Sequence, residues 1–231
     1  MLPCFAFWAA AFAALAFLAK PQIFVWTALG LAVAAAFDQR YRRFVRYAVV
    51  LGGAVVVCTW LAFPDWFPAW LAEIPPRRTG RSAVLFSALG QVLGTPGRVL
   101  AVAVIVGGVA LASAFVPGSD AWLAVWLALS SAGAIYSWSY DQVLLFVPLT
   151  IACGVLVADG RERMMRTLAL GGAATLLVVS LAFYAIGVIR HDETFSVAIP
   201  VAFFIAIVWS LWPYRRSTLV RERPAQQVQP A

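Results

Sequence analysis

Charged side chains are scarce in this sequence of 231 residues: Asp, Glu, Lys and Arg together make up 12%, whereas apolar residues make up 63%. A soluble domain carries roughly 25% charged and 45–50% apolar residues. So little charge cannot cover a surface that faces water, which excludes a water-soluble protein. Because about 20 apolar residues span a bilayer as a helix, the composition predicts a protein that crosses the membrane several times.

Cysteines and the signatures of soluble enzymes are also sparse. Cys4, Cys58 and Cys153 stand in apolar runs without paired spacing, so neither a disulfide framework nor a metal site is indicated. The patterns GxxxxGK[ST], GxGxxG, HExxH and DxD are missing, which disfavours nucleotide-dependent chemistry. The net charge of +7 is better explained by arginines placed on one side of a membrane than by nucleic acid, so no nucleic-acid partner is expected.

Long uncharged stretches predict the fold class, an all-α transmembrane bundle of about eight spans over residues 1–212. The predicted helices are residues 2–19, 22–37, 45–63, 99–116, 121–135, 143–158, 168–189 and 195–212. The stretches 22–37, 121–135 and 143–158 are short for a full span, so we expect them to be buried among neighbours or to end in a recessed cavity. The polar tail, residues 213–231, is expected to be disordered.

The positions of the basic residues predict the orientation of this bundle. If residues 38–44 lie inside, eleven of the 17 Lys and Arg residues fall on the inner side and six on the outer side, as the positive-inside rule requires. The protein is then a multi-pass plasma-membrane protein with both termini in the cytoplasm. This assignment requires that residues 83–97 do not cross, and the glycines and proline in that segment make it a poor span.

One substantial outer loop, residues 64–98, follows from this topology. It begins with aromatic residues spaced three and four apart, which predicts an interfacial helix with its rings at headgroup level: Phe63, Trp66, Phe67 and Trp70. A simple membrane anchor accounts for these rings. Farther along the loop stand Arg77, Arg78 and Arg81, where the positive-inside rule predicts few cations; they would bind either a diphosphate-like ligand or ordinary lipid headgroups.

Two further outer segments carry candidate functional residues. Lys20 and Gln22 join the first two helices, and the Lys20 ammonium would bind a lipid phosphate or reach to the headgroups as an anchor. The segment 135–142 brings aromatic rings, hydroxyls, an amide and a carboxylate together, including Trp138, Tyr140, Asp141 and Gln142. Aromatic faces pack on sugar rings while Asp and Gln bind hydroxyls, so this segment predicts a sugar site with Asp141 as a base. Its alternative is a helix cap beside an aromatic belt.

The only histidine lies in another outer loop. His191 precedes Asp192 and Glu193, and this trio would supply a base or a ligand. A solvated turn explains the same three residues more simply.

The order of these motifs resembles glycosyltransferase family 87, over what corresponds to its C-terminal half to two-thirds. The resemblance rests on AKPQ at 19–22, RYRR at 40–43 and YSWSYDQ at 136–142. It implies a GT-C-like fold and the transfer of mannose, arabinofuranose or a related sugar from a polyprenyl-phosphate donor to a glycan or glycolipid acceptor on the outer face. No other cofactor is implied.

The sequence departs from that family in its first outer loop, where such enzymes usually carry a catalytic acid. The polar residues there are Lys20 and Gln22, and we therefore expect the chain to correspond to a transferase without its N-terminal portion. Two other functions stay open: a transporter or lipid-handling protein without catalysis, and an inactive partial transferase. The gathering of polar residues at helix ends, rather than at mid-span, favours the transferase over the transporter.

A phosphate role for Lys20 predicts that Lys20→Ala weakens binding of a polyprenyl-phosphate sugar by about ten- to a hundredfold, because a charge-assisted hydrogen bond is lost. Equilibrium binding of the donor to the purified protein measures this. An unaltered donor affinity would remove Lys20 from the site.

Overall fold

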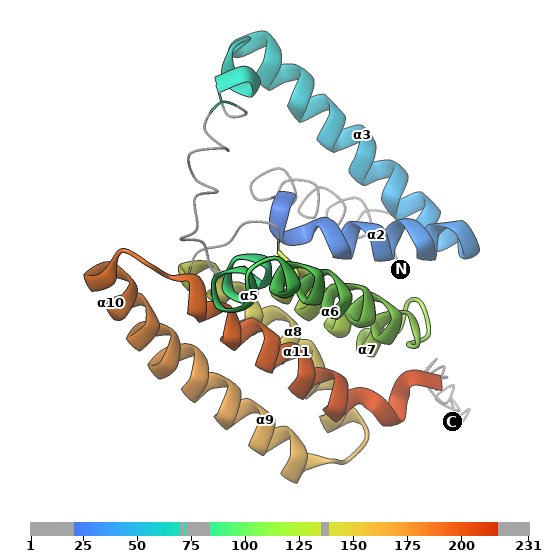
Figure 1. Cartoon of the computed structure of the whole chain (residues 1–231). Helices are drawn as coiled ribbons and strands as arrows, with labels where there is room; N and C mark the ends of the chain where they lie inside the picture. Colours follow the sequence, from blue (N-terminus) through green and yellow to red (C-terminus); the bar gives the residue numbers. More distant parts are fainter. Residues whose placement is uncertain (1–20, 70–71, 73–83, 135–138, 217–231) are drawn as a thin grey trace, which may run out of the picture.

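The computed structural model describes residues 21–69, 72, 84–134 and 139–216 of the chain (Figure 1). Within these ranges the regular elements are all helical, as the composition predicted. Their order is α2 (Pro21–Phe37), α3 (Gln39–Ala62), α5 (Leu85–Leu93), α6 (Thr95–Ser113), α7 (Asp120–Ala132), η1 (Ser139–Leu145), α8 (Phe146–Ala158), α9 (Glu162–Ala174), η2 (Thr175–Val179), α10 (Ser180–Arg190), η3 (Thr194–Val197), α11 (Ala198–Leu211) and η4 (Trp212–Arg216). The η2 segment is a π-helix, and the other η segments are 3₁₀-helices.

Five helical runs in the described part of the chain are long and apolar enough to cross a membrane: Tyr41–Ala62, Thr95–Ser113, Asp141–Ala158, Glu162–Arg190 and Thr194–Arg216. Two shorter apolar helices, Phe24–Phe37 and Asp120–Ala132, accompany them. These features indicate a membrane protein. The predicted helix 2–19 lies outside the described residues, and the count of eight spans stays a prediction.

Several helix boundaries differ from those predicted. Helix α3 begins at Gln39 rather than at residue 45, and α9, η2 and α10 form one helical run from Glu162 rather than from residue 168. The arginine-rich segments were predicted as loops because of their charge, but arginine is a good helix former. Residues 39–44 and 162–167, which the structure adds to the helices, contain neither Gly nor Pro. Arg42 also binds the end of α2, with its guanidinium donating to the carbonyls of Ala35 and Ala36 at 3.1 and 3.2 Å.

Helix α7 is the centre of the bundle. Nine of its 13 residues are buried, and it packs against α2, α8 and α11. Small residues allow this close approach: a Cβ on Gly30 of α2 would lie 2.7 Å from the Trp126 ring, and one on Gly108 of α6 would lie 2.7 Å from Leu129. Over its described residues, 121–134, the short predicted stretch 121–135 is therefore mostly buried among its neighbours, one of the two alternatives expected of it.

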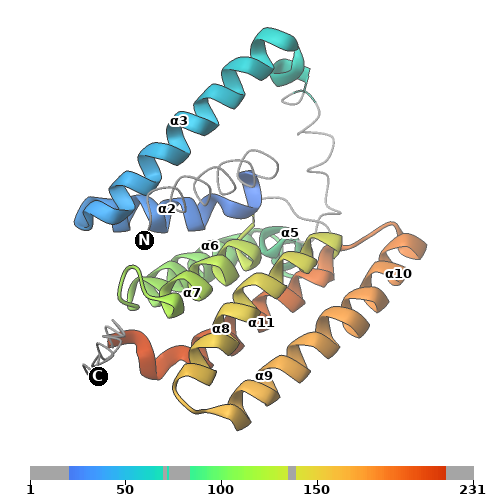
Figure 2. The same cartoon turned by 180° about the vertical axis from the view of Figure 1, so that it is seen from behind.

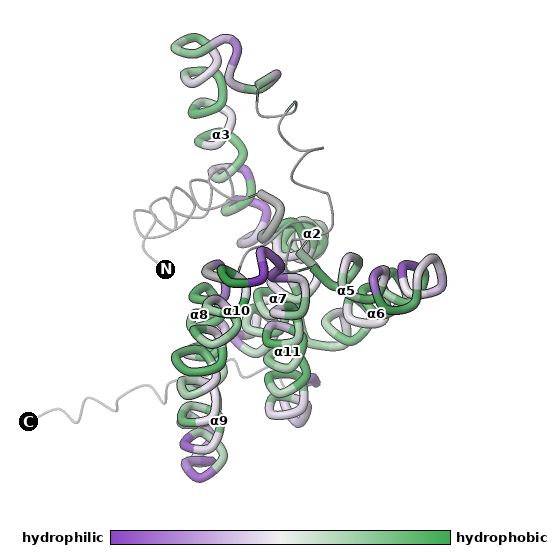
Figure 3. The backbone as a smooth tube through the Cα atoms, turned by 60° about the vertical axis from the view of Figure 1, so that its left-hand side comes forward, coloured by the Kyte–Doolittle hydropathy of each residue, from purple (hydrophilic) through white to green (hydrophobic). Residues whose placement is uncertain are grey.

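Helix α3 packs mainly against α2 and then leaves the bundle (Figures 1 and 2). At its start, the Tyr41 ring meets the Trp122 ring of α7 edge to face at 5.9 Å. None of the most apolar stretch of α3 is buried, whereas 56% of the corresponding stretch of α11 is buried. In the tube coloured by hydropathy, hydrophobic positions run along the helices and hydrophilic ones gather near their ends (Figure 3). Exposed apolar side chains on α3 are what a lipid-facing surface requires.

Helices α5 and α6 form a tight hairpin that precedes the core helix α7 in the sequence. At nine residues α5 is about 14 Å long, which is shorter than the hydrocarbon core of a bilayer. Gly94 turns the chain between the two helices with φ of +65°. The predicted interfacial helix is helical at residues 66–69, where the rings of Trp66 and Phe67 lie 5.5 Å apart, and Trp70 lies outside the described residues.

The hairpin generates a stability prediction at Gly97. A Cβ there would overlap the Leu89 carbonyl oxygen, so Gly97→Ala must separate the two helices. We expect the free energy of unfolding to fall by about 3 kcal/mol, measured by thermal unfolding of the purified protein.

Gly107 on the same helix is the matched control, because a Cβ there meets no atom within 4 Å. Gly107→Ala should leave the stability unchanged or raise it by up to about 1 kcal/mol, because Ala favours a helix more than Gly does. Equal effects of the two substitutions would contradict the close packing of α5 on α6.

Candidate functional site

The helices alternate between two ends of the bundle. At the first, which we call the η1 end, lie residues 21–26, 85–98, 133–134, 139–145 and 190–197. Three hydrogen bonds join its segments: Trp26 Nε1 to Gly133 O at 2.7 Å, Gln91 Nε2 to Thr194 Oγ1 at 3.1 Å, and Gln142 Nε2 to Ser196 O at 2.8 Å. Segments predicted to lie on one side of the membrane therefore meet at one end of the bundle.

At the opposite end, the η4 end, lie residues 37–43, 113–120, 158–166 and 212–216. Tyr214 Oη donates to Asp159 Oδ2 at 2.6 Å, and Arg161 Nε lies 3.2 Å from the same oxygen. The Phe115 and Trp212 rings meet edge to face at 6.2 Å. These contacts join the end of α11 to the turn between α8 and α9, so this end is held by structural interactions.

Asp141 and Gln142 are the candidate site residues whose side chains the structure describes. Both lie in η1, the 3₁₀-helix that leads into α8, and they are only 7% and 4% exposed. A buried carboxylate and a buried amide are rare unless neighbouring groups satisfy them. Their burial places both side chains inside the η1 end.

Segment η3 supplies two buried hydroxyl groups beside this pair. Thr194 and Ser196 are both 0% exposed, and the Ser196 carbonyl accepts the hydrogen bond from Gln142. The Ser196 hydroxyl donates to Glu193 O at 2.8 Å. Of the seven buried polar residues among those described, four therefore belong to η1 and η3: Asp141, Gln142, Thr194 and Ser196.

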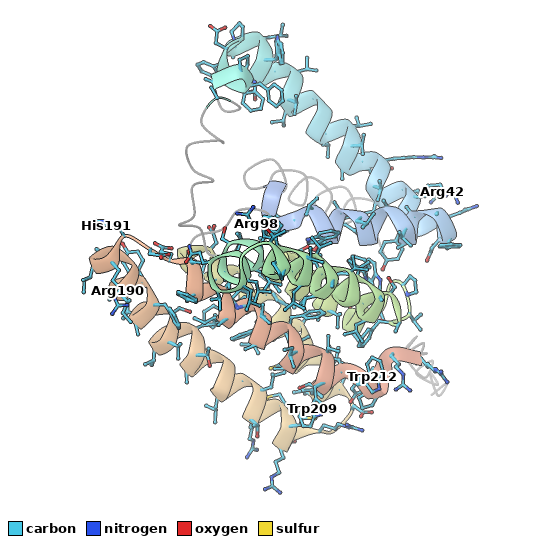
Figure 4. The ribbon with its side chains drawn as sticks, viewed as in Figure 1. Arg42, Arg98, Arg190, His191, Trp209 and Trp212 are labelled. Carbon is cyan, nitrogen blue, oxygen red and sulfur yellow. The ribbon has the colours of Figure 1, made fainter. Side chains whose placement is uncertain are left out.

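The loop before η3 has a structural role. His191 is exposed and takes a left-handed conformation, with φ of 53°, that ends α10. Asp192 Oδ1 accepts a hydrogen bond from the Thr194 N–H at 2.9 Å and so shapes the turn. Figure 4 shows Arg190 and His191 at the tip of α10, away from the core of the bundle. This arrangement fits the turn, which was the simpler interpretation of the trio.

Arg98 is a cation that the structure describes at the η1 end. Its stem covers Gly90, where a Cβ would lie 3.2 Å from Arg98 Cγ, and its guanidinium lies 5.7 Å from the Phe86 ring centroid. Figure 4 shows this side chain beside the α5 and α6 hairpin. Arg98 thus braces the hairpin through a cation–π contact.

Most of the predicted phosphate-binding residues lie outside the described part of the chain: Lys20, Arg77, Arg78 and Arg81, together with the aromatic residue Trp138. Gln22 lies in the first turn of α2 and Tyr140 in η1, and both helices reach the η1 end. Their roles remain predictions.

Sequence reasoning missed Gln91, Thr194 and Ser196 as members of this polar cluster. Each stands in or beside an apolar stretch, where a single amide or hydroxyl resembles ordinary helix surface. The available signal was the position of Thr194 and Ser196 directly before an apolar helix and directly after an acidic turn. In the described part of the chain, no three His, Cys, Asp or Glu side chains lie close enough together to hold a metal ion.

The side chains of η1 and η3 determine which hydrogen bonds this end of the bundle can make. A carboxylate accepts hydrogen bonds or a proton, an amide both donates and accepts, and hydroxyls do the same. Such a set has the donors and acceptors to bind a polyhydroxylated ligand, and a carboxylate within reach of a hydroxyl group can act as a general base.

The Gln142 amide generates a stability prediction. Gln142→Glu replaces the N–H donor by a carboxylate oxygen opposite the Ser196 carbonyl, so two acceptors face each other in a buried place. We expect the free energy of unfolding at neutral pH to fall by about 2–3 kcal/mol. Gln39→Glu, at an exposed position in the first turn of α3, is the control and should leave thermal stability nearly unchanged. Equal thermal shifts in the two variants would contradict a structural role of the amide.

Comparison of the chain with protein-family models, with curated proteins and with solved structures found no match in any of the three.

Proposed function

We propose that this chain forms part or all of a membrane glycosyltransferase that takes a sugar from a polyprenyl-phosphate donor. The observation that carries the proposal is the burial of Asp141 and Gln142 side by side at one end of an apolar bundle. Burying a carboxylate in a membrane protein is costly, so such a group is a functional candidate by default. A donor with an apolar tail and a polar head suits a polar cluster at the end of lipid-facing helices.

The proposed reaction is a direct displacement at the anomeric carbon. Asp141 accepts the proton from a hydroxyl of a glycan or glycolipid acceptor, and the oxygen of that hydroxyl forms a bond to the anomeric carbon. The bond from this carbon to the phosphate oxygen breaks, polyprenyl phosphate leaves, and the configuration inverts. General-base catalysis of this kind contributes about 10²–10⁴-fold to a rate.

Other predicted residues have matching proposed roles. Trp138, Tyr140 and Gln142 would bind the sugar, because they surround Asp141 in the sequence. Lys20, Gln22 and the Arg77, Arg78 and Arg81 cluster would bind the phosphate. The position of Gln22 supports this assignment, since α2 is joined to the η1 end by the hydrogen bond from Trp26 to Gly133. Cations there would stabilise the phosphate as it departs.

The distribution of arginine supports a site on the outer face. At or near the η4 end the described residues include Arg40, Arg42, Arg43, Arg46, Arg161, Arg163, Arg166, Arg215 and Arg216, whereas the η1 end includes Arg98 and Arg190. By the positive-inside rule the η4 end faces the cytoplasm, and the η1 end faces outward in the plasma membrane. Both termini would then be cytoplasmic.

Replacing Asp141 tests the proposed function. Asp141→Asn keeps the shape of the side chain but removes the base, so we expect the transfer of sugar from a polyprenyl-phosphate donor to fall at least about a hundredfold. Radiolabelled transfer in membranes that contain equal amounts of each variant measures this.

Asp120→Asn is the matched control, because Asp120 is exposed in the first turn of α7 at the η4 end. Its turnover should equal that of the unsubstituted chain. Full activity of Asp141→Asn would remove Asp141 from the reaction. The absence of any transfer by the whole native protein, assayed in its own membranes, would overturn the transferase itself.

A further inference from the structure

Four buried side-chain atoms in the described part of the chain lack a hydrogen-bond partner: the indole nitrogens of Trp66 and Trp126, the amide oxygen of Gln142 and the hydroxyl of Ser180. A buried polar atom without a partner is rare in native proteins and requires an explanation. The two oxygens belong to η1 and α10, which pack against each other.

Hydrogen-bond chemistry identifies which atom of the Gln142 amide is without a partner. Its other end contacts the Ser196 carbonyl at 2.8 Å, and a carbonyl only accepts hydrogen bonds. The nitrogen must therefore face Ser196, which leaves Oε1 as the free acceptor. Any group that satisfies Oε1 has to be a hydrogen-bond donor.

Ser180 lies at an irregular point of its helix. It follows the π-helical turn η2, and its N–H donates to the Thr175 carbonyl five residues earlier. Hydroxyl side chains elsewhere in these helices donate to the carbonyl four residues earlier, as Ser113 does to Val109 and Thr175 does to Gly171. The Ser180 hydroxyl makes no such bond, and single π-helical turns occur often at functional sites.

The packing of α8 on α9 places Gln142 Oε1 and Ser180 Oγ at about the same height along the helix axes. Leu149 of α8 packs on Gly172 of α9, where a Cβ would lie 2.8 Å from the leucine. Eight residues on from Gly172, or about 12 Å, the chain reaches Ser180. Seven residues back from Leu149, partly as 3₁₀-helix, it reaches Gln142 after about 12 Å. The packing of η1 against both η2 and α10 agrees with this register.

We infer that Gln142 Oε1 and Ser180 Oγ form a subsite for a hydroxyl group of the sugar, next to Asp141. The sugar hydroxyl donates to Gln142 Oε1, and the Ser180 hydroxyl donates to the sugar oxygen or accepts from a neighbouring hydroxyl. This inference rests on the proposed function and extends it to Ser180, a residue that no sequence motif includes.

The test compares Ser180→Ala with Ser113→Ala in the full chain reconstituted in lipid nanodiscs. Ser113 is exposed and bonded within its own helix, so it is the matched control. The probes are short-chain polyprenyl-phosphate mannose, its arabinofuranose counterpart and the same polyprenyl phosphate without sugar. For the sugar lipid that the unsubstituted chain prefers, we expect Ser180→Ala to weaken binding about five- to tenfold and to leave the sugarless lipid unaffected.

Thermal unfolding without ligand separates a binding role from a structural one. Removing a buried hydroxyl that has no partner should leave the Tm of Ser180→Ala unchanged or raise it. A lowered Tm, or sugar-lipid affinity equal to that of Ser113→Ala, would overturn the subsite while leaving the proposed function intact. If neither sugar adds affinity over polyprenyl phosphate in the unsubstituted chain, the proposed function fails and the subsite fails with it.

Discussion

Close packing around α7 is the constraint on which the other helix positions depend. Ala121, Ala124, Ala128 and Ala132 recur every three or four residues, so neighbouring backbones approach this helix closely. Facing glycines in α2 and α6 admit the larger side chains of α7, such as Trp126 and Leu129. In a membrane, where lipid and protein interiors are equally apolar, such close packing replaces the hydrophobic effect as the attraction between helices. Because α2, α8 and α11 all pack on α7, the segments that join them meet at the same two ends.

The two ends of the bundle use polar residues differently. At the η4 end, Tyr214, Asp159 and Arg161 satisfy one another and join helices. At the η1 end, a carboxylate, an amide and two hydroxyls are buried together, and one amide oxygen has no partner among the described residues. A network whose members are all paired stabilises a fold, whereas a buried unpaired acceptor lowers stability unless a ligand satisfies it. This contrast makes the η1 end the candidate site.

Much of the architecture could be predicted from residue pattern alone. Seven of the eight predicted helical stretches lie on described residues, and each contains an apolar helix. The helix starts at Gln39 and Glu162 were missed because charge was taken as a sign of a loop, although arginine favours a helix wherever its side chain reaches water. At the candidate site, Asp141 and Gln142 were predicted because aromatic rings, hydroxyls, an amide and a carboxylate stand together in segment 135–142 near the end of an apolar helix. Ser180 was not predicted as a site residue, since a single serine in an apolar helix looks like any other helix residue until the positions of the neighbouring helices are known.

The sequence by itself determined the helical class, the membrane setting and the concentration of charge at helix ends, because these depend on composition and on the cost of placing charge in hydrocarbon. Only the tertiary structure decided which ends meet, that α7 lies at the centre, and that Gln142 binds Ser196, 54 positions farther along the chain. Such contacts depend on the shapes of facing helices and on their register, which local periodicity does not encode. The hydrogen-bond partner of a buried polar atom is likewise decided by the packing of the bundle, because several distant segments carry groups that could donate to it or accept from it.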